Sequence, residues 1–220
     1  MNLSVIIPAY NEASRIQNVL KVVTACDYVD EIIVVDDGST DGTAAMASKC
    51  QRAHVLRLPI NGGKGAAVAA GVRFARGEVC LLLDADLSGL TEPHVRLLVA
   101  PLFAGQCDMT LGVLSGGNFW SDAGQGVSPA LSGQRALKRE TLAKIPGLAD
   151  CRMGVEVLIN LAIRQQGGRI TRISLEGVNH ALKEQKMGWY RGISARCRMY
   201  REIGMTLLRI RRRQRPVKVS

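Results

Sequence analysis

The sequence lacks long hydrophobic runs and cysteine pairs with metal-binding or redox spacing. Its longest apolar stretches fall far below the roughly 18 residues that a transmembrane helix needs. No basic segment precedes the short apolar run at the N-terminus, so we expect no signal peptide. None of the six cysteines stands in a CxxC pair. These absences predict a cytoplasmic protein with reduced thiols and no zinc knuckle.

The positive charge is concentrated at the C-terminal end of the chain. The 220 residues carry a formal net charge of +10, and residues 191–220 contain ten lysines and arginines but only one acid. The rest of the chain is nearly neutral, with 19 basic and 18 acidic residues. A nucleic-acid binder would spread its positive charge over a folded face, so we expect no nucleic-acid partner. With 47% hydrophobic residues, the chain can bury a core without disulfides.

Short β-branched runs alternate with helical patterns through the first half of the chain. Continuous apolar strands separated by helices are typical of an α/β fold with a mostly parallel sheet covered on both faces. Ligands bind such sheets beyond the carboxyl ends of the strands. A Gly/Ser-rich stretch over 115–128 is predicted to be a mobile loop. The pattern predicts strands over residues 3–7, 31–35, 54–58, 78–83, 109–114 and 169–175, and helices over 12–25, from about 42, and over 65–76, 92–104, 135–144 and 154–165.

The basic C-terminal segment has the spacing of an amphipathic helix. Apolar residues from Trp189 to Ile210 recur at steps of three or four, and arginines occupy much of the remainder. Such a helix can lie on an anionic membrane surface, which would place the protein at the inner membrane face. Alternatively, its apolar stripe packs on the protein body or on a second subunit, which would make a homodimer. Residues 191–220 are therefore predicted to form a basic amphipathic helix and tail.

Two carboxylates end the fourth predicted strand, in the sequence Asp84-Ala85-Asp86. Desolvating carboxylates is costly, so a buried strand that runs into two of them favours a functional role. Residues i and i+2 of an extended segment point the same way. Asp84 and Asp86 can therefore face one divalent cation, Mg²⁺ or Mn²⁺, which would also bind phosphate oxygens. A solvated strand end is the alternative interpretation.

Polar residues also follow the second strand and precede the third helix. Asp36 and Asp37 end the second strand, where adjacent acids suit recognition of sugar hydroxyls or a base N–H. The segment Asn-Gly-Gly-Lys-Gly at 61–65 offers a lysine and a helix N-terminus, a combination that favours phosphate binding. The sequence contains neither a dinucleotide-binding glycine fingerprint nor a P-loop.

Together these segments resemble those of GT-A glycosyltransferases of the family 2 type. The likeness rests on Pro-Ala-Tyr-Asn-Glu at 8–12, Val-Asp-Asp-Gly-Ser-Thr-Asp-Gly-Thr at 35–43, and the segments at 61–65 and 84–86, in this order. It implies a Rossmann-like GT-A domain over 1–190, with a nucleotide-binding half over about 1–90 and an acceptor half over about 91–190. The residues that it implies for nucleotide-sugar binding are Pro8, Ala9, Tyr10, Glu12, Asp36, Asp37, Gly63, Lys64, Asp84 and Ala85.

Motifs in the second half of the chain resemble those of two particular groups of glycosyltransferases. Leu-Ser-Gly-Gln-Arg-Ala at 131–136 is similar to the acceptor-loop motif of polyprenyl-phosphate sugar transferases and glucosyl-3-phosphoglycerate synthases. Gly-Val-Glu at 154–156, followed by Asn-His at 179–180, is more similar to the synthases. The resemblance implies His180 as a metal ligand beside Asp84 and Asp86. It also implies acceptor binding by Leu131, Ser132, Gly133 and Gln134, and catalytic roles for Asp86, Glu156 and Arg135.

The sequence therefore predicts a metal-dependent glycosyltransferase. It would move a sugar from a nucleoside-diphosphate sugar, with uridine or guanosine as the nucleoside, to a small phosphorylated acceptor. A polyprenyl phosphate at the membrane surface is the alternative acceptor, and it would explain the basic C-terminal segment. Glu156 would act as a general base, form hydrogen bonds with acceptor or sugar hydroxyls, or have a structural capping role, and the loop over 115–128 would close and exclude water. A non-catalytic protein that binds RNA or membranes through its tail is an alternative of another class.

Overall fold

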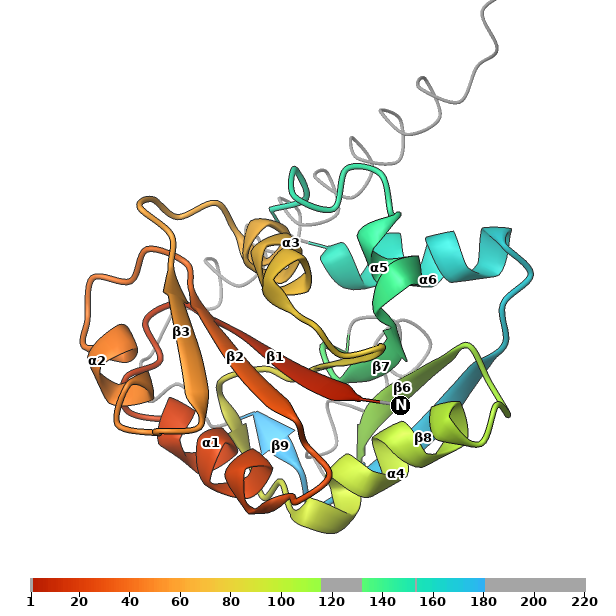
Figure 1. Cartoon of the computed structure of the whole chain (residues 1–220), viewed down its shortest axis with the longest axis horizontal. Helices are drawn as coiled ribbons and strands as arrows, with labels where there is room; N and C mark the ends of the chain where they lie inside the picture. The colour runs from red at the N-terminus through yellow and green to blue at the C-terminus, as the bar shows by residue number, and fades with distance from the viewer. Residues whose placement is uncertain (1, 116–131, 153, 181–220) are drawn as a thin grey trace, which may run out of the picture.

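A computed structural model describes residues 2–115, 132–152 and 154–180, in which helices cover both faces of one main sheet (Figure 1). Within these residues, the main sheet has seven strands and a separate small sheet has two. The seven strands are β1 (Leu3–Ala9), β2 (Glu31–Asp36), β3 (Ala53–Arg57), β4 (Val79–Leu82), β6 (Met109–Ser115), β7 (Arg135–Lys138) and β8 (Ile170–Glu176), and the two are β5 (Leu87–Ser88) and β9 (Asn179–His180).

The main sheet has the strand order β3-β2-β1-β4-β7-β6-β8. β7 runs antiparallel to β4 and β6, whereas all other neighbouring strands are parallel. The predicted mostly parallel α/β sheet is therefore confirmed. The helix predicted over 135–144 is wrong in its first part, because residues 135–138 pair with both β4 and β6. Only Arg139–Ala143 form a helix in that segment.

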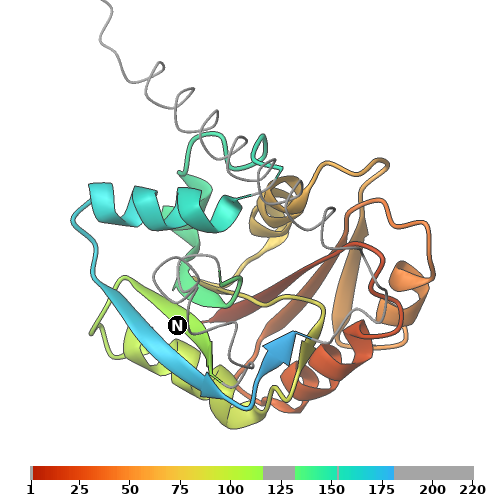
Figure 2. The same ribbon diagram turned by 180° about the vertical axis from the view of Figure 1, so that it is seen from behind.

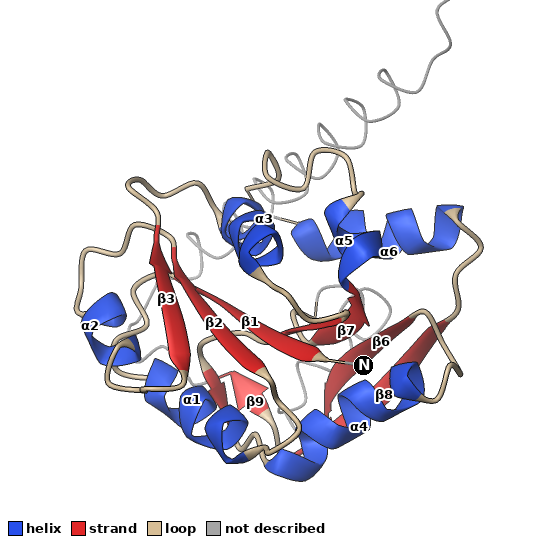
Figure 3. Ribbon diagram, viewed as in Figure 1, coloured by secondary structure: helices blue, strands red, loops and turns tan. Residues whose placement is uncertain are grey.

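Within the described residues, six helices form two layers, one on each face of the sheet (Figures 2 and 3). The helix predicted from residue 12 begins only at Ile16, because residues 13–15 form a turn in which the Glu12 carbonyl accepts the N–H of Arg15. One layer contains α1 (Ile16–Ala25), α2 (Thr43–Ala47) and α4 (Glu92–Phe103), and the other contains α3 (Lys64–Phe74), α5 (Arg139–Ala143) and α6 (Val155–Gln165).

No helix in the described ranges has the length and apolar composition to span a membrane.

Side chains of the central strands alternate between two hydrophobic cores. On β1, Val5 and Ile7 pack in the core that contains α1 and α4, while Ile6 packs in the core under α3 and α6. On β4, Cys80 is fully buried in the second core. Strands with both faces buried need apolar residues at every position, because successive side chains point to opposite faces. This is why the strands read as continuous hydrophobic runs.

The topology places three polar segments at one edge of the sheet. β1 pairs in parallel with β2 and β4, so residues 8–12, 36–37 and 84–86 all leave their strands at the same edge. The small sheet adds a fourth segment, since Leu87 of β5 pairs with His180 of β9. His180 is thereby held close to the end of β4 although it is distant in the sequence.

The start of α3 lies against the segment that precedes α6. The N–H groups of Lys64 and Gly65 donate to the carbonyls of Arg152 and Cys151, each at 3.0 Å. A Cβ at Gly65 would lie 2.1 Å from the Cys151 carbonyl oxygen and 2.4 Å from that of Leu148, so only glycine permits this approach. These two N–H groups therefore already have protein acceptors, and of the phosphate-binding groups predicted in this segment the side chain of Lys64 lines the pocket.

Replacing Gly65 by alanine tests this close approach. The new methyl group would collide with backbone atoms, so we expect Gly65→Ala to lower the free energy of unfolding by about 1–3 kcal/mol. Gly42→Ala is the control, because a Cβ there has its nearest neighbour at 4.0 Å, and it should cost less than about 1 kcal/mol. Urea denaturation followed by circular dichroism measures both variants. Wild-type stability of Gly65→Ala would contradict the packing described here.

Candidate active site

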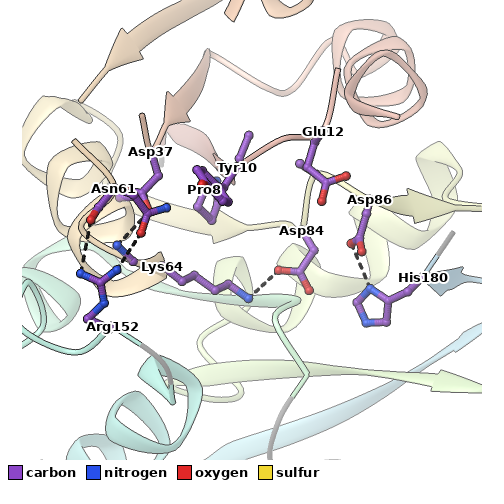
Figure 4. Close-up of a pocket in the computed structure, with 14 residues that line it drawn as sticks. Pro8, Tyr10, Glu12, Asp37, Asn61, Lys64, Asp84, Asp86, Arg152 and His180 are labelled. Carbon is purple, nitrogen blue, oxygen red and sulfur yellow. Dashed lines mark hydrogen bonds and ion pairs between the residues drawn. The ribbon is translucent and has the colours of Figure 1, made fainter. Parts of the chain in front are cut away.

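A pocket of about 610 Å³ opens at the carboxyl ends of β1 and β4 (Figure 4). Asn61, Ala67 and Arg152 line it, although none of them was itself predicted as a site residue. Asn61 belongs to a segment that the sequence singled out, whereas Arg152 reaches the pocket only through the tertiary contact with α3 and carries no local signal. The other lining residues were predicted from the sequence: Pro8, Ala9, Tyr10, Glu12, Asp37, Gly63, Lys64, Asp84, Ala85, Asp86 and His180.

Lys64 lies between two carboxylates at the pocket. Its Nζ is 2.5 Å from Oδ1 of Asp84 and 2.6 Å from Oε1 of Glu156. The side-chain amide of Gln134 donates to the other Asp84 oxygen, Oδ2, at 2.8 Å. Lys64 begins α3, Asp84 follows β4, and Glu156 lies in the first turn of α6. The ion pairs therefore connect the segment after β4 to helices on one face of the sheet.

These contacts set the charges of the pocket. Burial by itself raises the pKa of Asp84, but the positive charge and hydrogen bond of Lys64 outweigh it, so that the pKa is lowered. Burial likewise lowers the pKa of Lys64, yet the charges of Asp84 and Glu156 raise it above its usual value. Both groups are therefore ionised at neutral pH. The pocket contains a fixed ammonium group.

Asp84, Asp86 and His180 form a cluster at one end of the pocket, and their ligating atoms lie within 4.8 Å of one another. Nδ1 of His180 is 3.0 Å from Oδ1 of Asp86 (Figure 4). The hydrogen bond to Asp86 raises the pKa of His180, against the opposing effect of burial. Carboxylate oxygens suit Mg²⁺ and Mn²⁺, and imidazole is a common partner for divalent cations. The side chains fit the cation that the sequence predicts.

The two acids that end β2 have different surroundings. The carboxylate of Asp37 lines the pocket and accepts the N–H groups of Gly62 and Gly63, each at 2.8 Å. Asp36 is 1% exposed and does not line the pocket. One of its oxygens accepts the N–H of Ser39 at 3.0 Å, and the other is 3.5 Å from Nε of Arg57. Asp37 thus shapes the segment before α3, and Asp36 shapes the turn after β2.

The segment after β1 contributes an exposed aromatic ring and a buried acid. Tyr10 is 45% exposed and lines the pocket. Glu12 is buried, and its Oε2 lies 2.5 Å from Nε of Arg15. The backbone N–H of Glu12 donates to the hydroxyl of Thr43 at 2.8 Å, which links this segment to the start of α2. The ring of Tyr10 is therefore available to a ligand, and Glu12 is held in place.

The predicted acceptor segment lies against Asp84. A Cβ at Gly133 would lie 2.2 Å from Oδ2 of Asp84, so the carboxylate occupies the space that any other residue would fill. The Oγ of Ser132 donates to Oε1 of Gln134 at 2.7 Å. Neither Gln134 nor Arg135 lines the pocket, and both are fully buried. Arg135, predicted as catalytic, instead donates hydrogen bonds to the backbone carbonyls of Ser132 and Glu156 and to the side chain of Asn160.

Three predictions fall on residues outside the described ranges. These are the acceptor role of Leu131, most of the loop over 115–128, and the basic amphipathic helix and tail over 191–220.

Removing the ammonium group of Lys64 tests the ion pairs. Lys64→Met leaves the carboxylates of Asp84 and Glu156 without their cation, and we expect it to lower the free energy of unfolding by about 1–3 kcal/mol after allowance for partial solvent screening. Lys144→Met is the control, because Lys144 pairs with Glu140 on the helix surface, and it should leave stability unchanged. Chemical denaturation compares the two variants. Equal stability would show that the Lys64 ion pairs do not hold the pocket together.

Comparisons with known proteins identify the family of this chain. The family model of Glycosyl transferase family 2 matches residues 4–154, well over half of the chain. The Dictyostelium discoideum dolichyl-phosphate beta-glucosyltransferase is 39% identical over 105 residues, which cover 41% of this chain and 32% of that protein. A dolichyl-phosphate beta-glucosyltransferase of Trichomonas vaginalis is 43% identical over 94 residues, which cover 37% of this chain and 28% of that protein. The matches thus span about a third of these relatives.

A solved structure shares the fold over most of its length. Glucosyl-3-phosphoglycerate synthase from Mycobacterium tuberculosis, in complex with Mn²⁺, UDP-glucose and phosphoglyceric acid, aligns with a TM-score of 0.68 and 27% identity. The alignment covers 83% of this chain and 72% of the synthase. The same synthase in complex with Mg²⁺ and UDP aligns with a TM-score of 0.67 and 28% identity. The fold is the GT-A fold that the resemblance implied, and the chain belongs to glycosyl transferase family 2.

Proposed function

We propose that this chain transfers a sugar from a UDP-sugar to an acceptor that bears a phosphate group, with the help of a divalent cation. The observation that carries the proposal is the meeting of Asp84, Asp86 and His180 beside Lys64 in one pocket. The synthase of similar fold supports the choice of donor and metal, because its structure holds UDP-glucose and Mn²⁺.

The two ends of the pocket differ in chemistry, and they suggest how the donor lies. Asp37, Asn61 and Arg152 are at one end, and Asp86 and His180 are at the other (Figure 4). We place the base and ribose at the first end, where the side chains offer both hydrogen-bond donors and acceptors. We place the diphosphate at the second end. Between them, the exposed ring of Tyr10 offers a face for stacking, and Lys64 lies within reach of a phosphate.

Charge stabilisation is the chemistry that these residues suit. When the sugar leaves, negative charge develops on the nucleoside diphosphate, and a divalent cation held by Asp84, Asp86 and His180 would stabilise it. Lys64 adds a fixed positive charge beside that position and needs no rearrangement to do so. Glu156 is 8% exposed and contacts Lys64 instead of lining the pocket. We therefore assign Glu156 to holding Lys64, and not to general-base catalysis.

A phosphate is the common feature of the two acceptors that we consider. Phosphoglyceric acid is bound in the synthase structure, which favours a small phosphorylated acceptor. The curated relatives are named for dolichyl phosphate, which favours a polyprenyl phosphate. An enzyme that uses a polyprenyl phosphate would work at a membrane surface, to which the basic residues of 191–220 would be attracted.

Donor binding is tested by thermal stability with UDP-glucose and a GDP-sugar, each with and without Mn²⁺. Because a ligand stabilises the state that it binds, UDP-glucose with Mn²⁺ at about 100 times its Kd should add about 2.7 kcal/mol to the wild type. Asp86→Ala and His180→Ala should lose this metal-dependent gain. Asp108→Asn is the control, because the Asp108 carboxylate does not line the pocket; it accepts the backbone N–H of Arg169 at 2.7 Å and forms an ion pair with the guanidinium group of Arg169. No gain with any donor would overturn the proposal.

The acceptor is tested by supplying phosphoglyceric acid or a polyprenyl phosphate in vesicles with UDP-glucose and Mn²⁺, and measuring the glucosylated product. Transfer to phosphoglyceric acid that is indifferent to vesicles supports a small acceptor. Transfer to polyprenyl phosphate that is lost when residues 191–220 are deleted, while donor binding is kept, supports the lipid acceptor. Hydrolysis of the donor without transfer to either compound would contradict a phosphate-bearing acceptor.

A further inference from the structure

Arg135 is a fully buried cation that contacts no carboxylate within the described residues. Its NH1 donates to the backbone carbonyl of Glu156 at 2.9 Å and to Oδ1 of Asn160 at 3.0 Å. Its NH2 donates to the backbone carbonyl of Ser132. One guanidinium group therefore connects the segment before β7 to the first turns of α6.

The contacts of Arg135 complete a closed ring of hydrogen bonds that includes the pocket-lining residues Asp84 and Lys64. On one side, Ser132 donates to Gln134, and Gln134 donates to Asp84. On the other side, Lys64 donates both to Asp84 and to Glu156. Arg135 joins the two sides, because it holds the carbonyls of Ser132 and Glu156 together. The ring runs through Arg135, Ser132, Gln134, Asp84, Lys64 and Glu156.

The chemistry of the guanidinium group explains why arginine occupies this position. Its planar fork of five N–H donors reaches several acceptors at fixed angles, whereas a lysine ammonium is a compact charge on a flexible stem. Burial lowers the pKa of Arg135 to about 10, against the opposing charges of Glu156 and Asp84. The group is therefore charged at neutral pH, and with Lys64 it balances the two carboxylates of the ring.

We propose that Arg135 is a positioning residue that fixes Lys64 and Asp84 by closing this ring, although it touches no substrate. The inference rests on the proposed transfer reaction and goes beyond it. Loss of the ring would let the Ser132–Gln134 segment and the start of α6 move independently. Lys64 and Asp84 would then lose their fixed separation, while Tyr10, Asp37 and Asn61 would still hold the base and ribose.

Arg135→Lys keeps the positive charge and removes the fork, so it isolates the positioning effect. We expect kcat for sugar transfer, or for hydrolysis of UDP-glucose, to fall roughly 10- to 100-fold, because small displacements of catalytic groups have effects of this size. KM for UDP-glucose should change little. Arg139→Lys is the matched control, since the Nε of Arg139 donates to the Gly77 carbonyl at 3.1 Å, outside the ring. It should keep the wild-type kcat.

A second readout does not depend on turnover. Acetylation of Lys64 by acetic anhydride, measured by mass spectrometry against the exposed Lys144 of the same chain, reports how firmly the ammonium group is held. We expect Lys64 to react at least about threefold faster in Arg135→Lys than in the wild type, and at the wild-type rate in Arg139→Lys. Ser132→Ala breaks the ring at another bond and should also speed the reaction, even if Arg135→Lys does not fold.

The two readouts separate the possible failures. If the wild type neither transfers glucose from UDP-glucose nor hydrolyses UDP-glucose, the proposed function fails. The acetylation rate of Lys64 then still decides whether Arg135 has the positioning role. If the wild type is active, and neither kcat nor the acetylation rate changes in Arg135→Lys and Ser132→Ala, then the positioning role is overturned. A loss of kcat without faster acetylation would also contradict it.

Discussion

The placement of Lys64 between Asp84 and Glu156 is the interaction on which the rest of the site depends. Burying a charged group is costly unless it has a partner of opposite charge. Removing either the cation or the carboxylates of a buried ion pair therefore strongly destabilises the fold. Here Nζ of Lys64 lies 2.5 Å from the carboxylate of Asp84 and 2.6 Å from that of Glu156. The buried guanidinium group of Arg135 supplies a second positive charge, so that two cations offset two carboxylates. The segment after β4, α3 and α6 must therefore keep their relative positions for these charges to remain satisfied.

The strand order of the main sheet brings these segments together. The order reverses direction at β1 and β4, and polar segments from both strands meet at that point, where α/β sheets bind ligands. The small sheet of β5 and β9 then holds His180 beside Asp86. The antiparallel β7 brings Gln134 to Asp84 and Arg135 to α6. A single pocket is thus built from segments spread over most of the described chain.

Much of the fold could be predicted from local sequence, and most of the pocket lining from the resemblance to family 2 glycosyltransferases. The parallel strands are continuous apolar runs because both faces are buried, and Asp84 and Asp86 stand out because carboxylates rarely follow such a run. β7 could not be identified in this way, because residues 135–144 carry a helical pattern and only pairing with β4 and β6 makes their first part a strand. The same limit applies to Arg152 and to the start of α3. Their roles depend on the contact between the two segments, which neither segment encodes by itself.

The central claim is that Asp86 and His180 hold a divalent cation against the diphosphate of a nucleotide sugar. The most direct test is anomalous diffraction at the manganese edge from crystals grown with UDP and Mn²⁺. We predict an anomalous peak bounded by the side chains of Asp86 and His180 and by the diphosphate of UDP. UDP bound in the pocket with no manganese at these side chains, or manganese bound elsewhere, would contradict it.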